Sequence, residues 1–367
     1  MFEEFKLESE IPTPRTEGIK YAGSKLKLIP YILDIIGHKG FRTVLDGFSG
    51  TTRVSQAFAQ IGMSVTANDI SEWSQVFATC YLKSSKENAF YEKILQELNA
   101  LPGVCGWFTE NYGGGVNEVK KPFQRHNTER LDAIRNRIDE LSLDWEDKCV
   151  VLSSLIFALD SVDSTLGHYA AYLNNWSPRS FNKMNLRLPR RFETDQLAHT
   201  VLRMDIFNAI QGRSFDAAYF DPPYGSNNEK MPPSRVRYGA YYHLWKTVVL
   251  NDRPRLFGKA GRREDSRDEC CSSLFEEYRK DAQGRYIAID AIDRLIREVQ
   301  SDYVLLSYSS GGRATKQELM DSLSSNGTIE TMKAIDYKKN VMADMRWTNE
   351  WINSDVQNQE YLFLLKK

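Results

Sequence analysis

The chain of 367 residues carries 48 lysines and arginines against 49 aspartates and glutamates, which gives a formal net charge of −1. Its 41% hydrophobic and 26% charged residues are typical of a globular protein with a sizeable core. No apolar run reaches the length of a membrane span, and the first residues lack a signal-peptide pattern, so we expect a cytoplasmic protein. The five cysteines have no metal-ligand spacing and are odd in number, so we expect neither a metal nor a disulfide framework.

The first part of the chain alternates between helical and strand patterns. Apolar residues at helical spacing predict a helix over 24–37, with Ser24 as its candidate N-cap. We then expect a strand at 43–46, a helix at 52–61, a strand at 64–67 and a helix at 72–81. This alternation with short turns is typical of a parallel sheet that helices cover on both faces.

The middle of the chain is different. Residues near 82–160 are predicted to be mainly helical, with the clearest amphipathic stretches at 127–141 and 145–159 and a glycine-containing loop at 107–123. Alternation resumes with a strand at 199–204, a helix at 206–211 and a strand that leads into Asp221. Later elements are expected as a helix at 289–300, a strand at 303–307, a helix at 315–324 and strands near 327–337 and 361–366.

The pattern therefore predicts one interrupted α/β domain. Residues 1–81 and 192–367 would form this catalytic domain, and residues 82–191 a mainly helical insertion. Within the domain, residues 226–285 would form a second excursion that is irregular, basic and aromatic.

Asp221, Pro222, Pro223 and Tyr224 follow the apolar strand pattern directly. Proline has no amide hydrogen and a fixed φ, so two consecutive prolines end the strand. An acid, free carbonyl groups and an aromatic ring are thereby expected at the carboxyl end of a strand, where open α/β sheets bind ligands. The set suits a planar heterocycle with an exocyclic amine, although it can also simply cap the strand.

Two further strand ends carry polar residues. The turn from Asp46 to Gly50 lets the backbone approach a ligand, and the next helix offers its amino end to an anionic group. Asp69 ends the second strand, where an acid can accept hydrogen bonds from ribose hydroxyls. Together they favour a nucleoside-containing cofactor. Asp205 follows a later strand and can bind an adenine amino group or cap the next helix.

Residues 20–25 place a lysine and an aromatic ring around a turn of small residues, ahead of the first helix. Lys25 can neutralise a carboxylate, and the ring of Tyr21 can lie on an apolar methylene or on an adenine face. A capped helix start is the alternative reading.

The order of these motifs resembles the methyltransferases that act on the amino group of adenine in DNA. It is most similar to the D12 class, the Dam-like family, whose target-recognition segment precedes the catalytic motif. The matching stretches are 20–25, 44–54, 68–70, 219–224 and 303–309. The resemblance implies a class I (Rossmann-like) α/β sheet that uses S-adenosylmethionine, with a mainly helical target-recognition insertion.

The resemblance also implies roles for single residues. Tyr21, Lys25, Asp69 and Asp221 would contact S-adenosylmethionine or line its site, with Asp205 as a further candidate. Asp46, Phe48 and Gly50 would shape the pocket for its methionine part. Thr52 stands where the family usually has a glycine, and Ser24 where a glycine is frequent, which leaves the backbone contacts of the first turn open.

The expected chemistry follows from adenine N6, whose lone pair is delocalised into the ring. Asp221 and the carbonyl of Pro222 would accept both N6 hydrogens and direct the lone pair toward the methyl donor, without a metal or a separate strong base. Because N6 is paired in a duplex, the base must be flipped out, and Tyr224 is the expected stacking partner. We therefore expect site-specific methylation of adenine N6 in double-stranded DNA, by an enzyme of bacterial or phage type.

Contacts to DNA outside the catalytic pocket must come from other segments, above all the helical insertion. Candidate DNA-binding residues are Lys121, Arg125, Arg179, Arg187, Arg235 and Arg237. Each basic cluster fits a solvated surface as well as a phosphate contact. A cognate restriction endonuclease is a candidate partner, a solitary modification enzyme is the alternative, and monomer and dimer both stay open. An RNA methyltransferase and a non-catalytic DNA-binding descendant are the alternatives; the residue 20–25 motif and the insertion disfavour the first, and intact Asp221 and Tyr224 the second.

Overall fold

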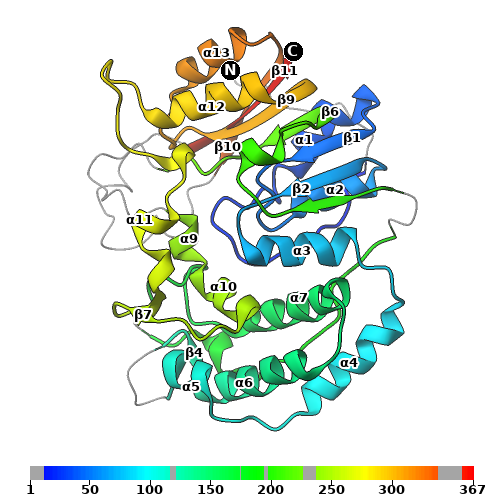
Figure 1. Cartoon of the computed structure of the whole chain (residues 1–367), viewed down its shortest axis with the longest axis vertical. Coiled ribbons are helices and arrows are strands. Elements are labelled where there is room, and N and C mark those ends of the chain that lie inside the picture. Colours follow the sequence, from blue (N-terminus) through cyan, green and yellow to red (C-terminus); the bar gives the residue numbers. More distant parts are fainter. Residues whose placement is uncertain (1–11, 116–120, 174, 194–196, 226–236, 338–357) are drawn as a thin grey trace.

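The computed structural model describes residues 12–115, 121–173, 175–193, 197–225, 237–337 and 358–367. Within these residues the main element is a seven-stranded sheet in the order β10-β11-β9-β6-β1-β2-β5 (Figure 1). Its strands are β1 (Thr43–Asp46), β2 (Ser64–Asn68), β5 (Thr200–Leu202), β6 (Ser214–Phe220), β9 (Gln300–Ser309), β10 (Thr328–Tyr337) and β11 (Asn358–Lys366). Neighbours pair in parallel from β9 to β5, and β11 runs antiparallel between β9 and β10.

Helices cover both faces of the sheet, as predicted. Successive side chains alternate between the faces, so that Val44 and Ala217 belong to one core cluster and Leu45 and Ala218 to the other. The first cluster includes α1 (Ile29–Ile36) and α2 (Arg53–Gln60). The second includes α8 (Ile206–Ala209), α12 (Ile287–Glu298) and α13 (Lys316–Ser324). The α/β architecture is therefore confirmed.

The first helix begins later than predicted, and the expected cap at Ser24 is wrong. Helix α1 starts at Ile29 with Leu28 in the N-cap position, and no side chain caps it within the described residues. Pro30 lies in the first turn, where its missing amide hydrogen costs nothing, whereas a helix that began at residue 24 would hold proline in its interior. The residues before α1 form turns instead, in which Leu28 N donates to Lys25 O at 2.8 Å.

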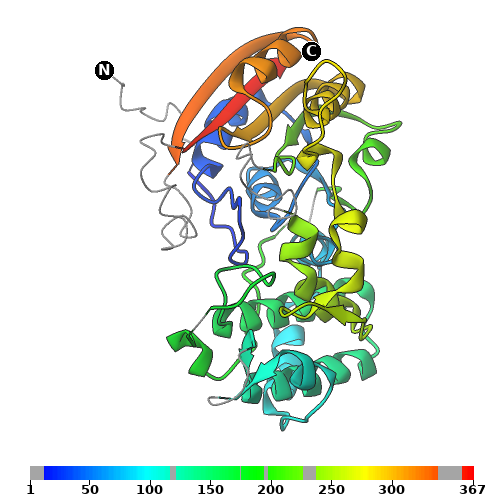
Figure 2. The ribbon, with the colours of Figure 1, turned by 90° about the vertical axis from the view of Figure 1, so that its left-hand side faces the viewer.

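The helices beside the sheet form a second part of the molecule and share one hydrophobic core. Its helices are α3 (Glu72–Leu82), which lies next to the sheet, α4 (Asn88–Ala100), α6 (Arg125–Glu140) and α7 (Trp145–Val162). Figures 1 and 2 show α4, α6 and α7 at the end of the molecule away from the sheet. Helix α10 (His243–Leu250) adds Leu244, Trp245 and Val248 to the same core, although it comes from a segment expected to be irregular.

A buried arginine links α10 to the helical unit. Arg135 on α6 is 1% exposed and donates from Nε to Val248 O at 2.7 Å and from Nη2 to Val249 O at 2.9 Å. These carbonyls lie in the last turn of α10, where helical carbonyls have no partner within the helix. The segment after residue 225 is thus partly an extension of the helical unit.

The loop expected over 107–123 contains a helix, so this prediction is wrong in part. Helix α5 (Trp107–Tyr112) leads into β3 (Gly113–Gly114), which pairs with β4 (Phe123–Gln124). Asp132 on α6 caps α5 from outside by accepting hydrogen bonds from the amides of Phe108 at 2.9 Å and Thr109 at 2.8 Å. No local residue pattern marks such a cap.

Further short elements follow residue 237. They are α9 (Tyr238–Tyr241), β7 (Leu256–Phe257), β8 (Arg262–Arg263) and α11 (Asp268–Cys271), and 3₁₀ turns lie at Gly37–Lys39, Pro178–Phe181, Glu264–Ser266 and Leu274–Glu276. The β7–β8 hairpin packs on α5, because Tyr112 donates its hydroxyl hydrogen to Gly261 O at 2.8 Å. In the described part of the chain, no helix has the length and apolar character of a membrane span.

Candidate active site

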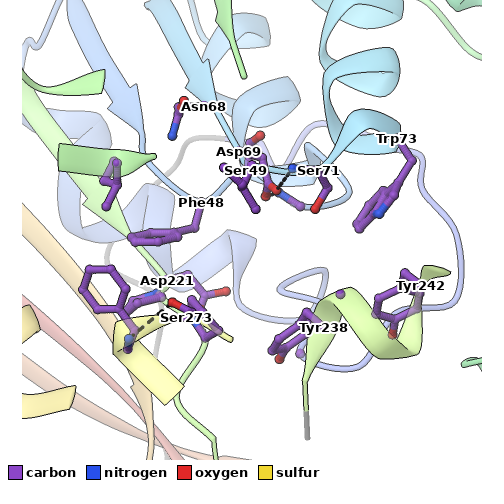
Figure 3. A pocket seen from close by; sticks show the side chains of 18 of the residues that line it. Phe48, Ser49, Asn68, Asp69, Ser71, Trp73, Asp221, Tyr238, Tyr242 and Ser273 are labelled. Atoms are coloured by element: carbon purple, nitrogen blue, oxygen red, sulfur yellow. Dashed lines mark hydrogen bonds between the residues drawn. The ribbon is translucent and has the colours of Figure 1, made fainter. Parts of the chain in front are cut away.

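A cavity of about 690 Å³ lies at the carboxyl ends of β1, β2 and β6, which is a usual size for a small-molecule site. Figure 3 shows side chains from the turns after these strands and from α9 around a common space. The structure brings together most of the residues predicted from the sequence: Tyr21, Lys25, Asp46, Phe48, Gly50, Asp69, Asp205, Asp221, Pro222 and Pro223 all line it. Asp205 also caps α8 by accepting from Phe207 N at 2.9 Å.

Asp69 joins the turns that follow β1 and β2. Its Oδ2 accepts a hydrogen bond from Gly50 N at 2.9 Å, and its Oδ1 accepts one from Ser71 N at 2.8 Å. Burial raises the pKa of Asp69, and the amides of Ser71 and Gly50 oppose this rise. Gly50 has a φ of +47°, which glycine adopts without strain. The carboxylate therefore holds the glycine turn against the end of the second strand.

Thr52 takes the conformation that glycine would take at this turn. Its φ is 61°, in the left-handed region, and its side chain is fully buried. Its Oγ1 accepts a hydrogen bond from Gln56 Nε2 at 3.1 Å, and its amide donates to Ser49 O at 2.6 Å. The turn therefore has a left-handed backbone at Thr52, a conformation that strains a threonine but not a glycine.

Asp46 presents an unsatisfied carboxylate oxygen at the cavity. The residue is 1% exposed, and its Oδ2 accepts a hydrogen bond from Ser55 Oγ at 2.5 Å. Its Oδ1 is buried and has no hydrogen-bond partner among the described residues. Burial raises the pKa of Asp46 to about 7. The hydrogen bond from Ser55 lowers this pKa, and the charges of Asp221 and Asp69 raise it further. Such an oxygen suits a cationic group of a ligand.

Aromatic rings form one wall of the cavity. Tyr21 stacks on Tyr242 with ring centroids 4.7 Å apart, and it contacts Tyr238 at 5.4 Å and Trp73 at 5.6 Å. Trp73 and Tyr238 line the cavity as well (Figure 3), although neither was predicted. Trp73 lies in the first turn of α3, a few residues after Asp69. This position near the end of β2 could have identified it as a cavity-lining residue from the sequence.

Lys25 lies between two carboxylates. Its Nζ is 2.9 Å from Asp221 Oδ1 and 3.8 Å from Glu360 Oε1, and its side chain is 5% exposed. Burial by itself lowers the pKa of Lys25, but Asp221 and Glu360 outweigh this effect and raise it. Burial raises the pKa of Asp221 to about 7, where Lys25 opposes the rise and Glu360 adds to it. The Asp221 carboxylate is therefore fixed by a lysine that is charged at neutral pH.

Tyr224 lies beside the cavity wall and is not among the lining residues. Its hydroxyl donates to Glu360 Oε1 at 3.3 Å, and its ring centroid is 5.2 Å from that of Tyr308. Glu360 was not predicted from the sequence, because it lies in β11, far along the chain from the other site residues. The expected stacking of Tyr224 on a base stays a prediction.

The candidate DNA-binding residues do not gather around the cavity. Lys121 Nζ donates to Asn111 O at 2.7 Å, Arg179 pairs with Asp163 at 2.7 Å, and Arg187 pairs with Glu17 at 2.6 Å. Arg125 is exposed on α6, and Arg237 is 4% exposed, with Nε and Nη1 unpartnered among the described residues. Arg235 lies outside the described residues. No group of three His, Cys, Asp or Glu side chains that could hold a metal ion occurs in the described ranges.

Comparison with known proteins identifies the family. Residues 21–303 match the family model of D12 class N6 adenine-specific DNA methyltransferases. The chain is 28% identical to the type II methyltransferase M.NlaIII of Neisseria lactamica, over 95% of this chain and 99% of that protein. It is 27% identical to the modification methylase StsI of Streptococcus sanguinis over 88% of this chain, and 26% identical to the type II methyltransferase M.FokI of Planomicrobium okeanokoites over 95%. These alignments cover 48% of StsI and 53% of M.FokI, so the chain spans about half of each. With the matched family model covering most of its length, the chain belongs to the D12 class N6 adenine-specific DNA methyltransferase family.

Proposed function

We propose that this protein transfers a methyl group from S-adenosylmethionine to N6 of a specific adenine in double-stranded DNA. The observation that carries the proposal is the carboxylate of Asp221, held 2.9 Å from Lys25 at the edge of the cavity and followed directly by Pro222 and Pro223. This is an acceptor for an exocyclic amine at the carboxyl end of β6, where α/β sheets bind their ligands.

The cavity residues fit the proposed cofactor. Asp46, through its unpartnered Oδ1, would hold the ammonium group of the methionine part. Asp69 would accept from ribose hydroxyls, because each carboxylate oxygen has a lone pair beyond the one that the amide of Gly50 or Ser71 uses. Trp73 and Tyr21 offer aromatic surface beside these acids. When bound, S-adenosylmethionine supplies a methyl carbon on a positively charged sulfur, which keeps the bonding electron pair.

At the substrate, the protein groups position N6 and take its proton. The carboxylate of Asp221 and the carbonyl of Pro222 accept the two N6 hydrogens, which turns the lone pair toward the methyl carbon. As N6 gains the new bond to carbon, it becomes positively charged and loses one proton to Asp221. A pKa of about 7 suits a group that takes a proton near neutral pH. Asp221 then releases the proton to solvent, and the site returns to its starting state.

We infer that the helical unit, residues 82–191 together with α10, binds the DNA around the flipped adenine. The support is that α10 shares its core with α3, α6 and α7, so that the unit packs as one body beside the cavity. M.NlaIII and M.FokI are named as type II methyltransferases. By analogy we propose a role in restriction–modification, in a cytoplasm that also holds a cognate endonuclease, and either a monomer or a dimer fits this role.

The test is transfer of tritiated methyl groups from S-adenosylmethionine to duplex DNA and, in parallel, to structured RNA. We expect label on DNA alone, and none with Asp221→Ala. Sequencing of modified bases in DNA from expressing cells then gives the base and its flanking sequence. Label on RNA alone, or full activity of Asp221→Ala, would contradict the proposal.

A further inference from the structure

Glu360 reaches the catalytic centre because β11 is antiparallel. The parallel strands end at the cavity edge, so an antiparallel strand begins there, and Glu360 lies near the start of β11. The ladder pairs Glu360 with Ser309 of β9 on one side and with Ile335 of β10 on the other. Next to it, Gln359 N donates to Ser310 Oγ at 2.9 Å. The backbone that carries Glu360 is thus held by strands on both sides.

The carboxylate of Glu360 is buried against the residues that hold the substrate acid. The residue is 5% exposed; its Oε1 accepts from the Tyr224 hydroxyl at 3.3 Å and lies 3.8 Å from Lys25 Nζ. Its Oε2 is buried and has no hydrogen-bond partner among the described residues. A buried carboxylate with an unsatisfied oxygen destabilises the fold. Packing alone gives no reason for an acid at this position.

The charges around Glu360 leave the centre negative. Of the described residues, Lys25 is the one cation that contacts both acids, Asp221 and Glu360. The other groups that face them in the described residues are Tyr219 and Tyr224 from β6 and its end, Tyr238 from α9 and Tyr308 from β9. Burial raises the pKa of all four, so they are neutral at pH 7.

Two more charged residues lie nearby but are directed elsewhere. Arg313, after β9, has its guanidinium 5.7 Å from the ring of Tyr286. Asp336 of β10 pairs in the ladder with Gln359 rather than with Glu360, which places it on the opposite face of the sheet.

Asp46 acts on Asp221 from the first turn with a further negative charge when it is ionised. Lys25 therefore serves two acids, and its charge does not cancel both.

We propose that Glu360 is a positioning residue for methyl transfer, which draws part of the Lys25 charge away from Asp221 and anchors the Tyr224 hydroxyl. Asp221 then stays fixed by Lys25 and yet binds a proton more readily than it would beside Lys25 alone, which suits the group that takes a proton from N6. The net negative charge also stabilises the positive charge that develops on N6. This inference rests on the proposed function of the same site.

The test compares Glu360→Gln with Glu360→Asp, which keeps the charge, and with Glu330→Gln on β10 as a matched control. Glu330 pairs with Lys39 at the surface, away from the cavity. The first readout is carboxyl ¹³C NMR of labelled aspartates in the cofactor-free protein, with the Asp221 signal assigned by its loss in Asp221→Asn. We expect the Asp221 midpoint to fall by about one pH unit in Glu360→Gln, because an anion that raises it is removed.

The second readout is the pH profile of single-turnover methylation. Its acidic limb should shift to lower pH in Glu360→Gln, and the rate at its plateau should fall by about tenfold or more. Glu360→Asp should keep the wild-type midpoint, whereas a role in packing alone would leave the isosteric Glu360→Gln with wild-type activity and make the shorter Glu360→Asp the more harmful change. If Glu360→Gln does not fold, the test uses Glu360→Asp. A wild-type Asp221 midpoint in folded Glu360→Asp, with a faster methylation rate than in Asp221→Asn, supports the proposal. An Asp221 midpoint that falls although the charge is retained overturns it.

The two proposals fail separately. A wild-type protein that does not methylate adenine in DNA contradicts the proposed function, and the NMR midpoint still reports the effect of Glu360 on Asp221. An active wild type with the same Asp221 midpoint and the same pH profile in Glu360→Gln overturns the inference about Glu360 alone.

Discussion

Lys25 Nζ lies 2.9 Å from Asp221 Oδ1, which joins the turn before the first helix to the end of β6. The lysine side chain is 5% exposed and that of the acid 16%, so water screens the pair weakly. The contact fixes the acid at the edge of the cavity. It also explains why a lysine in an N-terminal turn lines the same cavity as Asp221, which comes much later in the chain.

Replacing Asp221 by asparagine should abolish most of the activity without unfolding the protein. The amide keeps the shape of the side chain but removes the charge that accepts the N6 hydrogens, so we expect kcat to fall by roughly 10²–10³-fold. Methyl transfer to duplex DNA and a thermal melt measure the two effects. Asp290→Asn on the surface of α12 is the control and should keep wild-type activity. Equal activities of the two variants would contradict the assigned role.

Asp46 should make the cofactor-free protein less stable as pH rises. Burial raises its pKa to about 7 from an ordinary 3.8, so the folded state holds a proton that the unfolded chain has released. The stabilisation is therefore complete below about pH 4 and is lost as pH rises through about 7. Asp46→Asn removes this effect, so the free energy of unfolding should decrease with pH less steeply, by up to about 1.4 kcal/mol per pH unit. Urea unfolding at about pH 5, 6 and 7 measures the slope; an unchanged slope contradicts the prediction.

Two substitutions at Thr52 should separate backbone strain from side-chain contacts. Thr52→Ala and Thr52→Gly both lose the hydrogen bond from Gln56, but glycine alone relieves the strain of a φ of 61°. We therefore expect Thr52→Gly to be more stable than Thr52→Ala by about 1 kcal/mol. Denaturant midpoints at equal m-values give the difference. The opposite order would show that the turn relaxes when the side chain is removed.

Asp163 should be more important for stability than any surface ion pair of the helical unit. Its side chain is 1% exposed and contacts Lys20 at 2.8 Å and Arg179 at 2.7 Å, so it ties the N-terminal turn to the end of α7. We expect Asp163→Ala to destabilise the protein by roughly 2–4 kcal/mol, less than a fully buried pair would, because both cations are partly exposed. Arg187→Ala, which removes a half-exposed arginine from a Glu17 carboxylate that keeps its hydrogen bonds from Tyr81 and Arg190, should cost under about 1 kcal/mol. Chemical denaturation of both variants tests the order.

The sequence by itself determined the strands and the polar residues at their ends. Asp46, Asp69 and Asp221 each end or directly follow an apolar strand, and parallel strands bring their carboxyl ends to one edge. The residue pattern therefore predicted the α/β fold and ten of the residues that line the cavity. These signals are local, since a strand and the residue that follows it are read from adjacent positions.

Only the tertiary structure decided the elements and contacts that depend on distant partners. Asp132 on another helix caps α5, and Arg135 on α6 binds the last carbonyls of α10. Glu360 lies beside Lys25 and Tyr224 because β11 is inserted antiparallel between β9 and β10. Strand order and direction arise from packing between segments far apart in the chain. The periodicity of one segment carries no information about its neighbours in the sheet, and for that physical reason Glu360 was missed.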